Sequence, residues 1–373
     1  MTNVLSRRAL NRATLARQLL LRRHEMPLLD AVGHLVGLQA QTPQSWYHGL
    51  WSRLTGFQPE RLAELLTDRT VARIALMRST IHLVTAADCL AIRPLVQPVI
   101  ERSMSGNFGR NLVGLDRDEV AAAGRKLVDE EPRTFSELGR LLAERWPGRD
   151  QASLAQAVRA WVPLVQVPPR GVWGKSGRAL HTSAEAWLGG TEATEAPPMT
   201  VDELVVRYLT AFGPATVMDA QTWSGLTRFA EVFERLRPQL RAFRDESDRE
   251  LFDLPDAPRP DPDTPAPVRF LYDYDNLLLS HADRSRVITD GYRWQQFPPD
   301  GVMPQIVLVD GMTAGTWKIN RSRASATLTV RPFARLAQAA MVELAEEAER
   351  LFEFAAANAT TRDIQFRPYP SRA

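Results

Sequence analysis

A fixed order of hydrophobic patterns occurs repeatedly along the first two thirds of this chain. Between about residues 6 and 90, leucines and valines recur at helical spacing in three stretches. Two short strand-like runs follow, at residues 73–78 and 80–84. Three helices followed by a two-stranded wing is the order of elements in a winged helix, a variant of the helix-turn-helix.

The same order of elements returns further along the chain, although the segments do not repeat by identity. Helical patterns at 118–128, 134–142 and 152–161 precede strand-like runs at 165–167 and 179–181, with a long turn at 168–177 between them. A third set of helical patterns begins at Val201, restarts at Pro214 and ends near Leu236. We therefore predict three tandem winged-helix modules, at residues 1–112, 113–198 and 199–260.

The remaining third of the chain has a different character. Residues 253–267 are rich in proline and aspartate, which resist both helix and sheet, and mark a linker. Beyond it lie short β-like runs at 268–272, 277–280, 306–309, 316–320 and 326–330, then a helical pattern at about 333–357. We predict a small antiparallel sheet or β-barrel with a final helix at 261–373, and hence an α+β fold overall.

The chain has the composition of a soluble globular protein, with 44% hydrophobic and 24% charged residues. We find no apolar run near the roughly 18 residues of a membrane helix, and no signal-type apolar core at the basic N-terminus. We expect a cytoplasmic protein that does not enter the membrane. The single cysteine, Cys89, lies in an apolar stretch and is expected to be a core thiol.

The net charge of +2 does not indicate a polyanion binder, but the arginines are unevenly distributed. Arginine suits bidentate contacts to phosphate. A GC-rich genome explains the overall excess of arginine over lysine more simply, although it does not explain the local crowding. The crowded positions at the N-terminus are Arg7, Arg8, Arg12, Arg17, Arg22 and Arg23.

Familiar catalytic signatures are missing from the sequence. There is no P-loop, no dinucleotide-binding fingerprint, no HExxH and no CxxC pair, and the six histidines are scattered. We therefore predict no cofactor and no metal site. Asp273, Asp275 and Asn276 could suggest a metal site, but turn and capping roles are the simpler interpretation.

The segment 37–46 carries the most informative polar residues. Pro43 pushes Thr42 out of the helical region, so a helix should end before it. In an extended chain Gln39 and Gln41 point to the same side, and two carboxamides can hold a water while contacting a sugar or phosphate. On chemistry alone, ordinary capping or solvent-facing glutamines are the better explanation of the segment.

Gln39-Ala40-Gln41 resembles the Gln-apolar-Gln motif of the bacterial winged-helix DNA glycosylases, the AlkZ-like family. Further stretches at 77–84, 168–174, 211–216 with 223–226, and 270–284 resemble the same family and span nearly the whole chain. The resemblance implies a DNA-sized channel between winged-helix modules and a C-terminal barrel, with Gln39 and Gln41 as catalytic residues. A sister branch carries aspartate in place of Gln41; the two-glutamine branch is associated with bulky adducts and crosslinks from natural-product genotoxins.

The resemblance predicts a monofunctional DNA glycosylase for bulky N7-alkylated purines, and for interstrand crosslinks, that confers self-resistance to an alkylating natural product. Its partner is double-stranded DNA, and we expect a monomer. The alternative is a winged-helix transcription regulator without catalysis, which would dimerise and present a recognition helix to the major groove.

Wings and basic turns commonly touch phosphate or the minor groove. The expected DNA contacts are Arg78 and His82, Arg170, Lys175 and Arg178 in the second wing, and His281, Arg284 and Arg286 at a hairpin tip.

Overall fold

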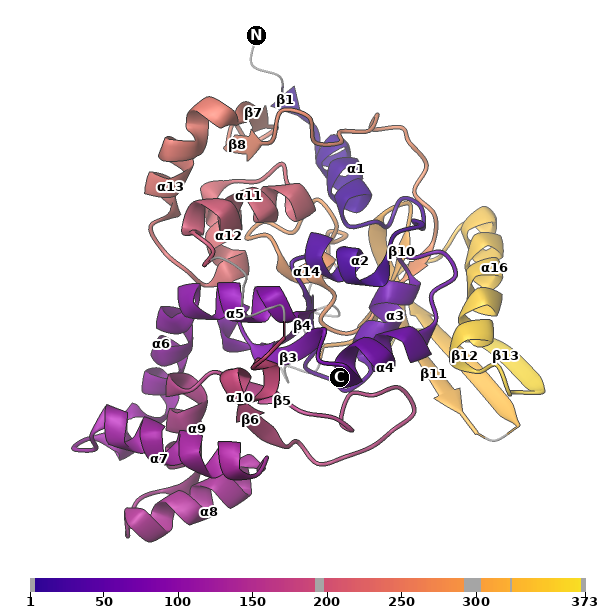
Figure 1. Ribbon diagram of the computed structural model, residues 1–373. Helices are drawn as coiled ribbons and strands as arrows, with labels where there is room; N and C mark the ends of the chain where they lie inside the picture. The colour runs from indigo at the N-terminus through magenta and orange to yellow at the C-terminus, as the bar shows by residue number, and fades with distance from the viewer. Residues whose placement is uncertain (1–3, 192–197, 292–302, 323, 370–373) are drawn as a thin grey trace.

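The computed structural model describes residues 4–191, 198–291, 303–322 and 324–369, which form an α+β fold (Figure 1). Its helices are α1 (Arg7–Arg17), α2 (Leu28–His34), α3 (Ser45–Trp51), α4 (Pro59–Thr67), α5 (Ala86–Leu95), α6 (Gln97–Phe108), α7 (Arg117–Glu130), α8 (Phe135–Arg145), α9 (Gln151–Trp161), α10 (Ala184–Leu188), α11 (Val201–Phe212), α12 (Val217–Ser224), α13 (Phe229–Leu236), α14 (Asn276–Leu279) and α16 (Gln338–Ala355). Its strands are β1 (Val4–Leu5), β2 (Leu38–Gln39), β3 (Val71–Ala75), β4 (Ile81–Thr85), β5 (Leu164–Gln166), β6 (His181–Ser183), β7 (Arg241–Asp245), β8 (Glu250–Asp253), β9 (Arg269–Phe270), β10 (Gln305–Val309), β11 (Met312–Arg321), β12 (Ser325–Pro332) and β13 (Thr361–Phe366).

The strands predicted as the first and second wings form one sheet. Its strand order is β2-β4-β3-β5-β6, and each neighbouring pair is antiparallel. The two wings join where Ile74 of β3 lies opposite Val165 of β5. The joined sheet leaves β2, whose last residue Gln39 begins the Gln-Ala-Gln motif, as an edge strand.

The helices predicted at 118–128, 134–142 and 152–161 are confirmed as α7, α8 and α9. Helix α8 begins at a capping box: the Thr134 hydroxyl accepts from the Glu137 amide at 3.2 Å, and the Glu137 carboxylate accepts from the Thr134 amide at 3.0 Å. Helices α11, α12 and α13 likewise appear where the third set of patterns predicts them, and the hairpin β7–β8 follows. Strand β1 pairs with β7 in parallel, which brings the N-terminus to this hairpin.

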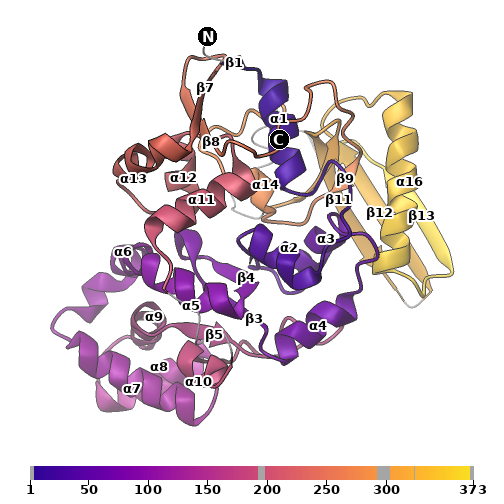
Figure 2. The same ribbon diagram turned by 45° about the horizontal axis from the view of Figure 1, so that its top comes forward.

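The C-terminal strands form an open, mixed sheet, which corrects the expectation of an antiparallel barrel. The order is β13-β12-β11-β10-β9, and β13 runs parallel to β12. Within the described ranges, no pairing closes the sheet between β13 and β9. Helix α16 covers one face, where Leu344, Leu351 and Phe352 join the buried cluster of the sheet (Figure 2).

The predicted strand at 277–280 is wrong, because most of it belongs to the short helix α14. The Asp275 carboxylate accepts from the Leu277 amide at 3.0 Å and caps this helix. Asp275 also forms a buried ion pair with Arg53, whose two terminal nitrogens lie 2.8 and 2.9 Å from the carboxylate oxygens. The expectation of a capping role is therefore confirmed for Asp275.

The arginines crowded at the N-terminus hold distant parts of the chain together. Arg17 is buried, and its Nη1 lies 2.6 Å from Asp253 Oδ1. Arg12, also buried, pairs with Asp310. Arg7, Arg8 and Arg23 form further ion pairs with Asp290, Asp310 and Glu347. This crowding therefore serves the contact between the N-terminal helix and the C-terminal half of the chain.

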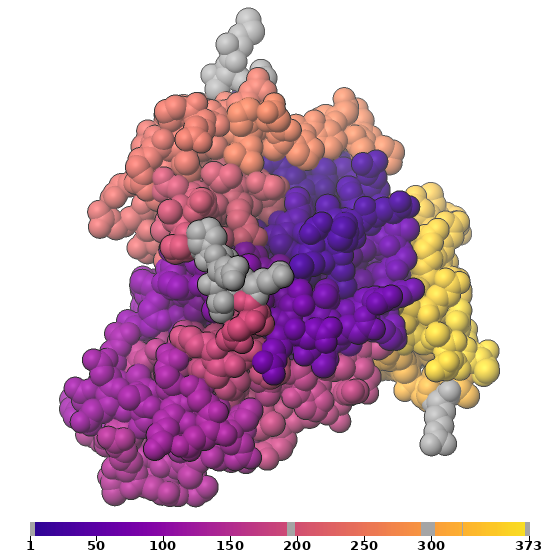
Figure 3. Space-filling view, in the orientation of Figure 1, coloured from indigo at the N-terminus to yellow at the C-terminus, as the bar shows by residue number. Residues whose placement is uncertain are grey.

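In the space-filling view the N-terminal region lies in the middle of the molecule, with the C-terminal sheet and α16 on one side (Figure 3). Helices α7–α9 form a lobe on the opposite side (Figures 1 and 3). None of the described helices combines the length and apolar character needed to cross a lipid bilayer. The division into modules at 112, 198 and 260 stays a prediction.

Candidate active site

Gln39 lies on β2, at the edge of the joined sheet. Strand β2 pairs with β4, so that Gln39 faces His82. The chain enters β2 through Gly37, which has a φ of 80°. A Cβ atom on Gly37 would lie 2.5 Å from Val84 Cγ1 and 2.7 Å from the Leu83 carbonyl oxygen. Glycine is therefore required where the chain passes from α2 into the motif strand.

Gln39 and Gln41 have different environments. The side chain of Gln39 is only 4% exposed, whereas Gln41 is exposed. The chain remains paired with β4 between them, because the Ala40 amide donates to the Ile81 carbonyl at 2.7 Å. The side-chain Oε1 of Gln41 accepts from the Ile81 amide at 3.4 Å. One carboxamide is thus fixed inside the protein, and the other reaches solvent beside it.

Arg78 holds the carboxamide of Gln39. Its Nη2 donates to Gln39 Oε1 at 2.8 Å, and its Nη1 donates to the carbonyl oxygen of Trp223. Burial, aided by the positive charge of Arg284, lowers the pKa of Arg78 to about 10, so it stays protonated at neutral pH. Because arginine only donates, Gln39 must turn its oxygen toward Arg78. The NH₂ group of Gln39 is left to donate to a substrate or to water.

His82 lies in the interior opposite Gln39. It is 1% exposed, and its Nδ1 lies 3.0 Å from the Thr80 carbonyl oxygen. Burial and the charge of Arg78 lower its pKa to about 3, so the ring is neutral at physiological pH. The structure therefore places Arg78 and His82, both expected as DNA contacts, next to Gln39 and in contact with protein groups.

The loop 273–276 lies against the motif segment. Asn276 Nδ2 donates to the Gly37 carbonyl at 2.7 Å, and Asn276 Oδ1 lies 3.4 Å from the Gln39 amide. Further along, the Thr42 hydroxyl donates to the Asp273 carboxylate. These contacts fix the motif segment at both ends, so the position of Gln39 depends on the C-terminal half of the chain.

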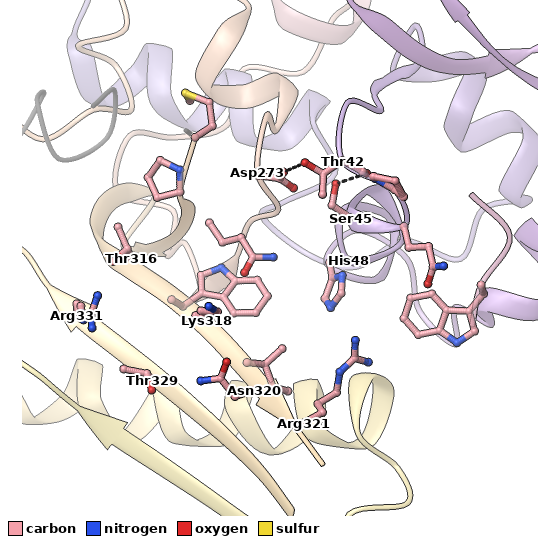
Figure 4. A pocket seen from close by; sticks show the side chains of 18 residues that line it. Thr42, Ser45, His48, Asp273, Thr316, Lys318, Asn320, Arg321, Thr329 and Arg331 are labelled. Atoms are coloured by element: carbon pink, nitrogen blue, oxygen red, sulfur yellow. Dashed lines mark hydrogen bonds between the residues drawn. The ribbon is translucent and has the colours of Figure 1, made fainter. Parts of the chain in front are cut away.

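A cleft of about 690 Å³ opens immediately after the motif, between α3 and the C-terminal sheet (Figure 4). Two groups of residues face each other across it. The motif wall consists of Thr42, Ser45, His48 and Asp273, and the sheet wall consists of Thr316, Lys318, Asn320, Thr329 and Arg331. Trp173, Trp317 and Arg321 also line the cleft.

The sheet wall is the polar face of β11 and β12. Thr316 lies opposite Arg331, and Lys318 lies opposite Thr329. Alternate residues such as Leu328 and Val330 are buried with α16 on the other face. Lys318 and Arg331 are exposed. Cations interspersed with hydroxyl groups on an open sheet face are suited to binding phosphate.

The motif wall is buried at Ser45, His48 and Asp273 and exposed at Thr42. His48 is 7% exposed, and burial with the nearby charge of Arg321 lowers its pKa to about 4. Asp273 is 8% exposed, and burial raises the pKa of its carboxyl above the ordinary value, against the opposing effect of the Thr42 hydroxyl. A neutral imidazole and a carboxyl group thus line the same side of the cleft.

Comparison with known proteins places this geometry in a family. The model of the AlkZ-like DNA glycosylase family matches residues 32–354. The chain belongs to this family. It is a DNA glycosylase, and its substrate is DNA. The family membership decides against the alternative of a regulator without catalysis.

The fold of the glycosylase is similar to that of a solved relative. The structure of the Streptomyces sahachiroi DNA glycosylase AlkZ superimposes with a TM-score of 0.75 at 20% sequence identity, over 98% of this chain and 100% of that one. No match was found among curated proteins. At this identity the likeness establishes the shared fold.

The second wing of the glycosylase lies beside the motif. The backbone carbonyl of Lys175 accepts from Gln44 Nε2 at 2.7 Å, and the Lys175 side chain is exposed. Arg170 is partly buried and bonds a carbonyl of its own turn at 3.1 Å. Arg178 forms an ion pair with Glu137 of α8. Of these three expected DNA contacts, Lys175 is the one that presents its charge to solvent near the motif.

The segment 280–286 does not form the predicted hairpin tip. His281 and Arg286 are buried, and they bond backbone carbonyls at the end of α11 and just after it, at 3.0 and 2.8 Å. Burial and the charge of Arg286 lower the pKa of His281 to about 3. Arg284 is partly buried, and its charge acts on Arg78. Among the three, Arg284 lies closest to the site.

Several residues of the cleft escaped the sequence analysis. His48 was not singled out, and Asp273 was considered only as a turn or metal-binding residue. The sheet wall could have been predicted from the sequence, because Thr316, Lys318 and Asn320 alternate with apolar residues in a strand pattern. That alternation indicates a sheet with one open polar face.

Cysteine and metal chemistry have no evident place in the described structure. Cys89 is fully buried, which confirms the expected core thiol, and burial raises its pKa to about 12. Within the described residues, no group of three or more His, Cys, Asp or Glu side chains is arranged to hold a metal ion. The chemistry that the site offers is that of carboxamides, one carboxyl group and cations.

Proposed function

We propose that this DNA glycosylase hydrolyses the N-glycosidic bond of bulky N7-alkylated purines, with Gln39 and Gln41 positioning the attacking water. The observation that carries the proposal is the fixed carboxamide of Gln39, held by Arg78 at 2.8 Å beside the exposed Gln41. The two carboxamides differ in exposure, so each can have a separate role. Gln39 provides a rigid donor, and Gln41 can orient water through its oxygen.

The chemistry of an N7-alkylated purine explains why carboxamides suffice. Alkylation places a positive charge on the base and makes it a good leaving group, so protonation of the base is unnecessary. Rupture of the bond leaves a sugar with oxocarbenium character, as in other glycoside cleavages. Gln41 is a very poor base, so the enzyme is restricted to lesions that are already activated by charge.

The setting of the site supports DNA as a bound duplex and adducts of considerable size. The sheet wall faces the motif wall across the cleft of about 690 Å³, and Lys175 lies close to the motif on another side. The same proposal includes interstrand crosslinks as substrates and self-resistance to a natural product that alkylates DNA. We also propose that the chain forms three winged-helix modules with the boundaries given above and acts as a monomer. Lys175 and Arg284 would then contact phosphate.

The test is incubation with duplex DNA that carries a single N7-methylguanine, or an adduct of an alkylating natural product. We expect an abasic site at the modified position, detected by strand cleavage after alkali, and release of the modified base. The same duplex without the lesion is the control. Release from undamaged DNA, or failure to release any N7-alkylated base, would contradict the proposal.

A further inference from the structure

Two buried side chains on the motif wall have polar atoms without partners. Neither ring nitrogen of His48 makes a hydrogen bond with a described residue, and the same holds for Asp273 Oδ1. Both side chains are more than nine-tenths buried, and both line the cleft (Figure 4). Buried polar groups in native proteins are nearly always hydrogen-bonded, so unpaired groups facing a cleft call for a ligand or ordered water.

The surroundings of His48 favour a flat ligand. Its ring lies 6.2 Å from that of Trp173, 5.8 Å from that of Trp317 and 5.3 Å from that of Phe354, between ring centroids. Trp173 and Trp317 themselves line the cleft. Aromatic walls with a few polar groups at fixed positions are typical of pockets that hold a planar heterocycle.

The size of the space is sufficient for a base that carries an adduct. The cleft of about 690 Å³ lies within the range of about 300–1,000 Å³ that holds drug-sized ligands. It adjoins a second cleft of about 930 Å³, and Gln44, Trp173 and Arg321 line both. A substituent on the ring can therefore extend past Trp173 into the second cleft.

The two walls carry opposite charges, so they should bind ligands of opposite charge. A carboxylate repels phosphate and attracts a cation, whereas Lys318 and Arg331 of the sheet wall do the reverse. Asp273 accepts from Thr42 on Oδ2, and the Ser45 hydroxyl lies close enough to lower the pKa of its carboxyl. Its Oδ1 makes no hydrogen bond with a described residue and is left for an incoming N–H donor. An N7-alkylated guanine offers both a positive ring and N–H donors along its edge.

We propose that the cleft binds the alkylated base itself: Asp273 Oδ1 accepts from an N–H of the cationic purine, and His48 hydrogen-bonds another polar atom of the ring. This inference rests on the proposed function and adds to it the residues that select the lesion. Thr42, which follows Gln41 directly, positions Asp273 at the end of the cleft nearest the motif. The base would thus leave the sugar at the glutamines and enter the cleft at Asp273.

The test uses two nucleosides and the full chain, and it does not require catalysis. Binding of 7-methylguanosine and of guanosine is measured by calorimetry at pH 6, where the alkylated nucleoside keeps both its positive charge and its N1–H. We expect the wild-type protein to bind the cationic nucleoside roughly 10- to 100-fold more tightly, the scale of one charge-assisted hydrogen bond. Asp273→Asn should lose most of this preference, and His48→Phe should weaken binding of both nucleosides while it keeps the ring packing.

Asp118→Asn, on the exposed surface of α7, is the matched control and should bind both nucleosides as the wild type does. The comparison of the two nucleosides on the wild-type protein needs no variant, so it stands even if a substitution prevents folding. Equal binding of the two nucleosides, or an Asp273→Asn variant that retains the preference, would overturn the inference.

Excision assays on the same preparations separate this inference from the proposed function. A protein that excises N7-alkylguanine but does not discriminate the nucleosides overturns the role of Asp273 alone. A protein that discriminates the nucleosides but forms no abasic site overturns the proposed function, because the cleft would then serve another reaction.

Discussion

The two walls of the cleft differ in nearly every physical property. The motif wall is buried except at Thr42, is attached to its neighbours by hydrogen bonds from the loop 273–276, and carries one carboxyl group and a neutral imidazole. The sheet wall is a regular strand pair whose outer side chains, Lys318 and Arg331, are exposed and cationic. The first wall combines α3 with two loops that are distant in the sequence, whereas the second follows from the alternation of side chains along two paired strands.

The difference indicates how one cleft can serve two demands of DNA repair. Contacts to the phosphate backbone must be independent of sequence and are suited to mobile, solvated cations. Recognition of a damaged base requires fixed groups with unsatisfied hydrogen-bonding capacity, because an incorrect base then leaves them unpaired. We therefore assign affinity to the sheet wall and selectivity to the motif wall, and the variants below test that assignment.

The largest effect is expected at the glutamines next to the motif wall. Gln39→Ala and Gln41→Ala should each lower the single-turnover excision rate by roughly 10- to 1000-fold, the scale of one positioned polar group. Affinity for the modified duplex should change little, because neither side chain supplies charge. The rate is measured by release of the modified base, and affinity by fluorescence anisotropy.

Gln151→Ala is the matched control for this prediction, since Gln151 is exposed on α9. Gln39 also holds Arg78, so the melting temperature of Gln39→Ala must be compared with that of Gln41→Ala. Wild-type turnover in the double variant would remove both carboxamides from the mechanism.

A second test concerns cations that lie outside both walls. Arg286 is buried, bonds the Pro214 carbonyl at 2.8 Å and lies 3.8 Å from Asp219. Arg286→Ala should lower the free energy of unfolding by about 2–3 kcal/mol, because it leaves buried acceptors unpaired. Arg284 is only partly buried, so Arg284→Ala should lower the free energy of unfolding less than Arg286→Ala and weaken DNA binding more. Chemical denaturation and DNA titration of the two variants provide the measurement.

Equal loss of stability in the two variants would show that Arg284 has a structural role as well. In that case we would assign the DNA contact near the motif to Lys175, whose side chain is exposed. Burial, rather than the presence of positive charge, would then be the better guide to which arginines meet DNA.

The sequence allowed local features to be predicted where neighbouring residues decide them. Pro43 correctly predicted that Thr42 lies outside a helix, since α3 begins only at Ser45. The short apolar run at 277–280 was assigned to a strand, because such a run does not distinguish strand from helix. The Asp275 cap decided that choice, and its buried partner Arg53 comes from a distant part of the sequence.

The same limit applies to the site. Gln39 and Gln41 were found because they form a compact motif. Asp273 and His48 meet only after the C-terminal half of the chain folds against α3, so no local pattern connects them. The open sheet likewise depends on β13 pairing in parallel with β12, a contact that follows the whole of α16 and that strand periodicity does not encode.

The third prediction tests the sheet wall. Lys318→Ala combined with Arg331→Ala should weaken binding to duplex DNA by roughly 10-fold at low salt. It should also reduce the dependence of log affinity on log salt by about 0.9 for each phosphate that the protein no longer neutralises. Excision from saturated complexes should stay close to the wild-type rate. Anisotropy titrations at salt concentrations between about 50 and 200 mM measure the slope.

Lys126→Ala combined with Arg140→Ala removes two exposed cations from α7 and α8 and is the matched control. An unchanged salt slope in the Lys318 and Arg331 variant would place the DNA elsewhere. A large loss of excision in saturated complexes would instead show that the sheet wall takes part in catalysis, and the separation between the two walls would fail.

The smallest effect concerns the pH dependence of stability, and it distinguishes the walls by their titrating groups. Burial lowers the pKa of His48 to about 4 in the folded protein, whereas an unfolded chain has the ordinary value of about 6.5. Between these values the unfolded chain binds a proton that the folded protein does not, so His48 makes stability fall as the pH falls. Between pH 8 and pH 6, the free energy of unfolding of His48→Phe should therefore fall by about 0.8 kcal/mol less than that of the wild type. For each further pH unit down to about 4, the difference should grow by up to about 1.4 kcal/mol.

Urea denaturation at a series of pH values measures this difference, and the other buried histidines cancel because both proteins share them. Lys318→Ala on the sheet wall should keep the wild-type slope, because this variant retains His48. Identical slopes in His48→Phe and the wild type would mean that His48 is protonated as readily in the folded protein as in the unfolded chain. The motif wall would then be open to water at this position, and it would not provide the neutral hydrogen-bonding group that recognition of the base requires.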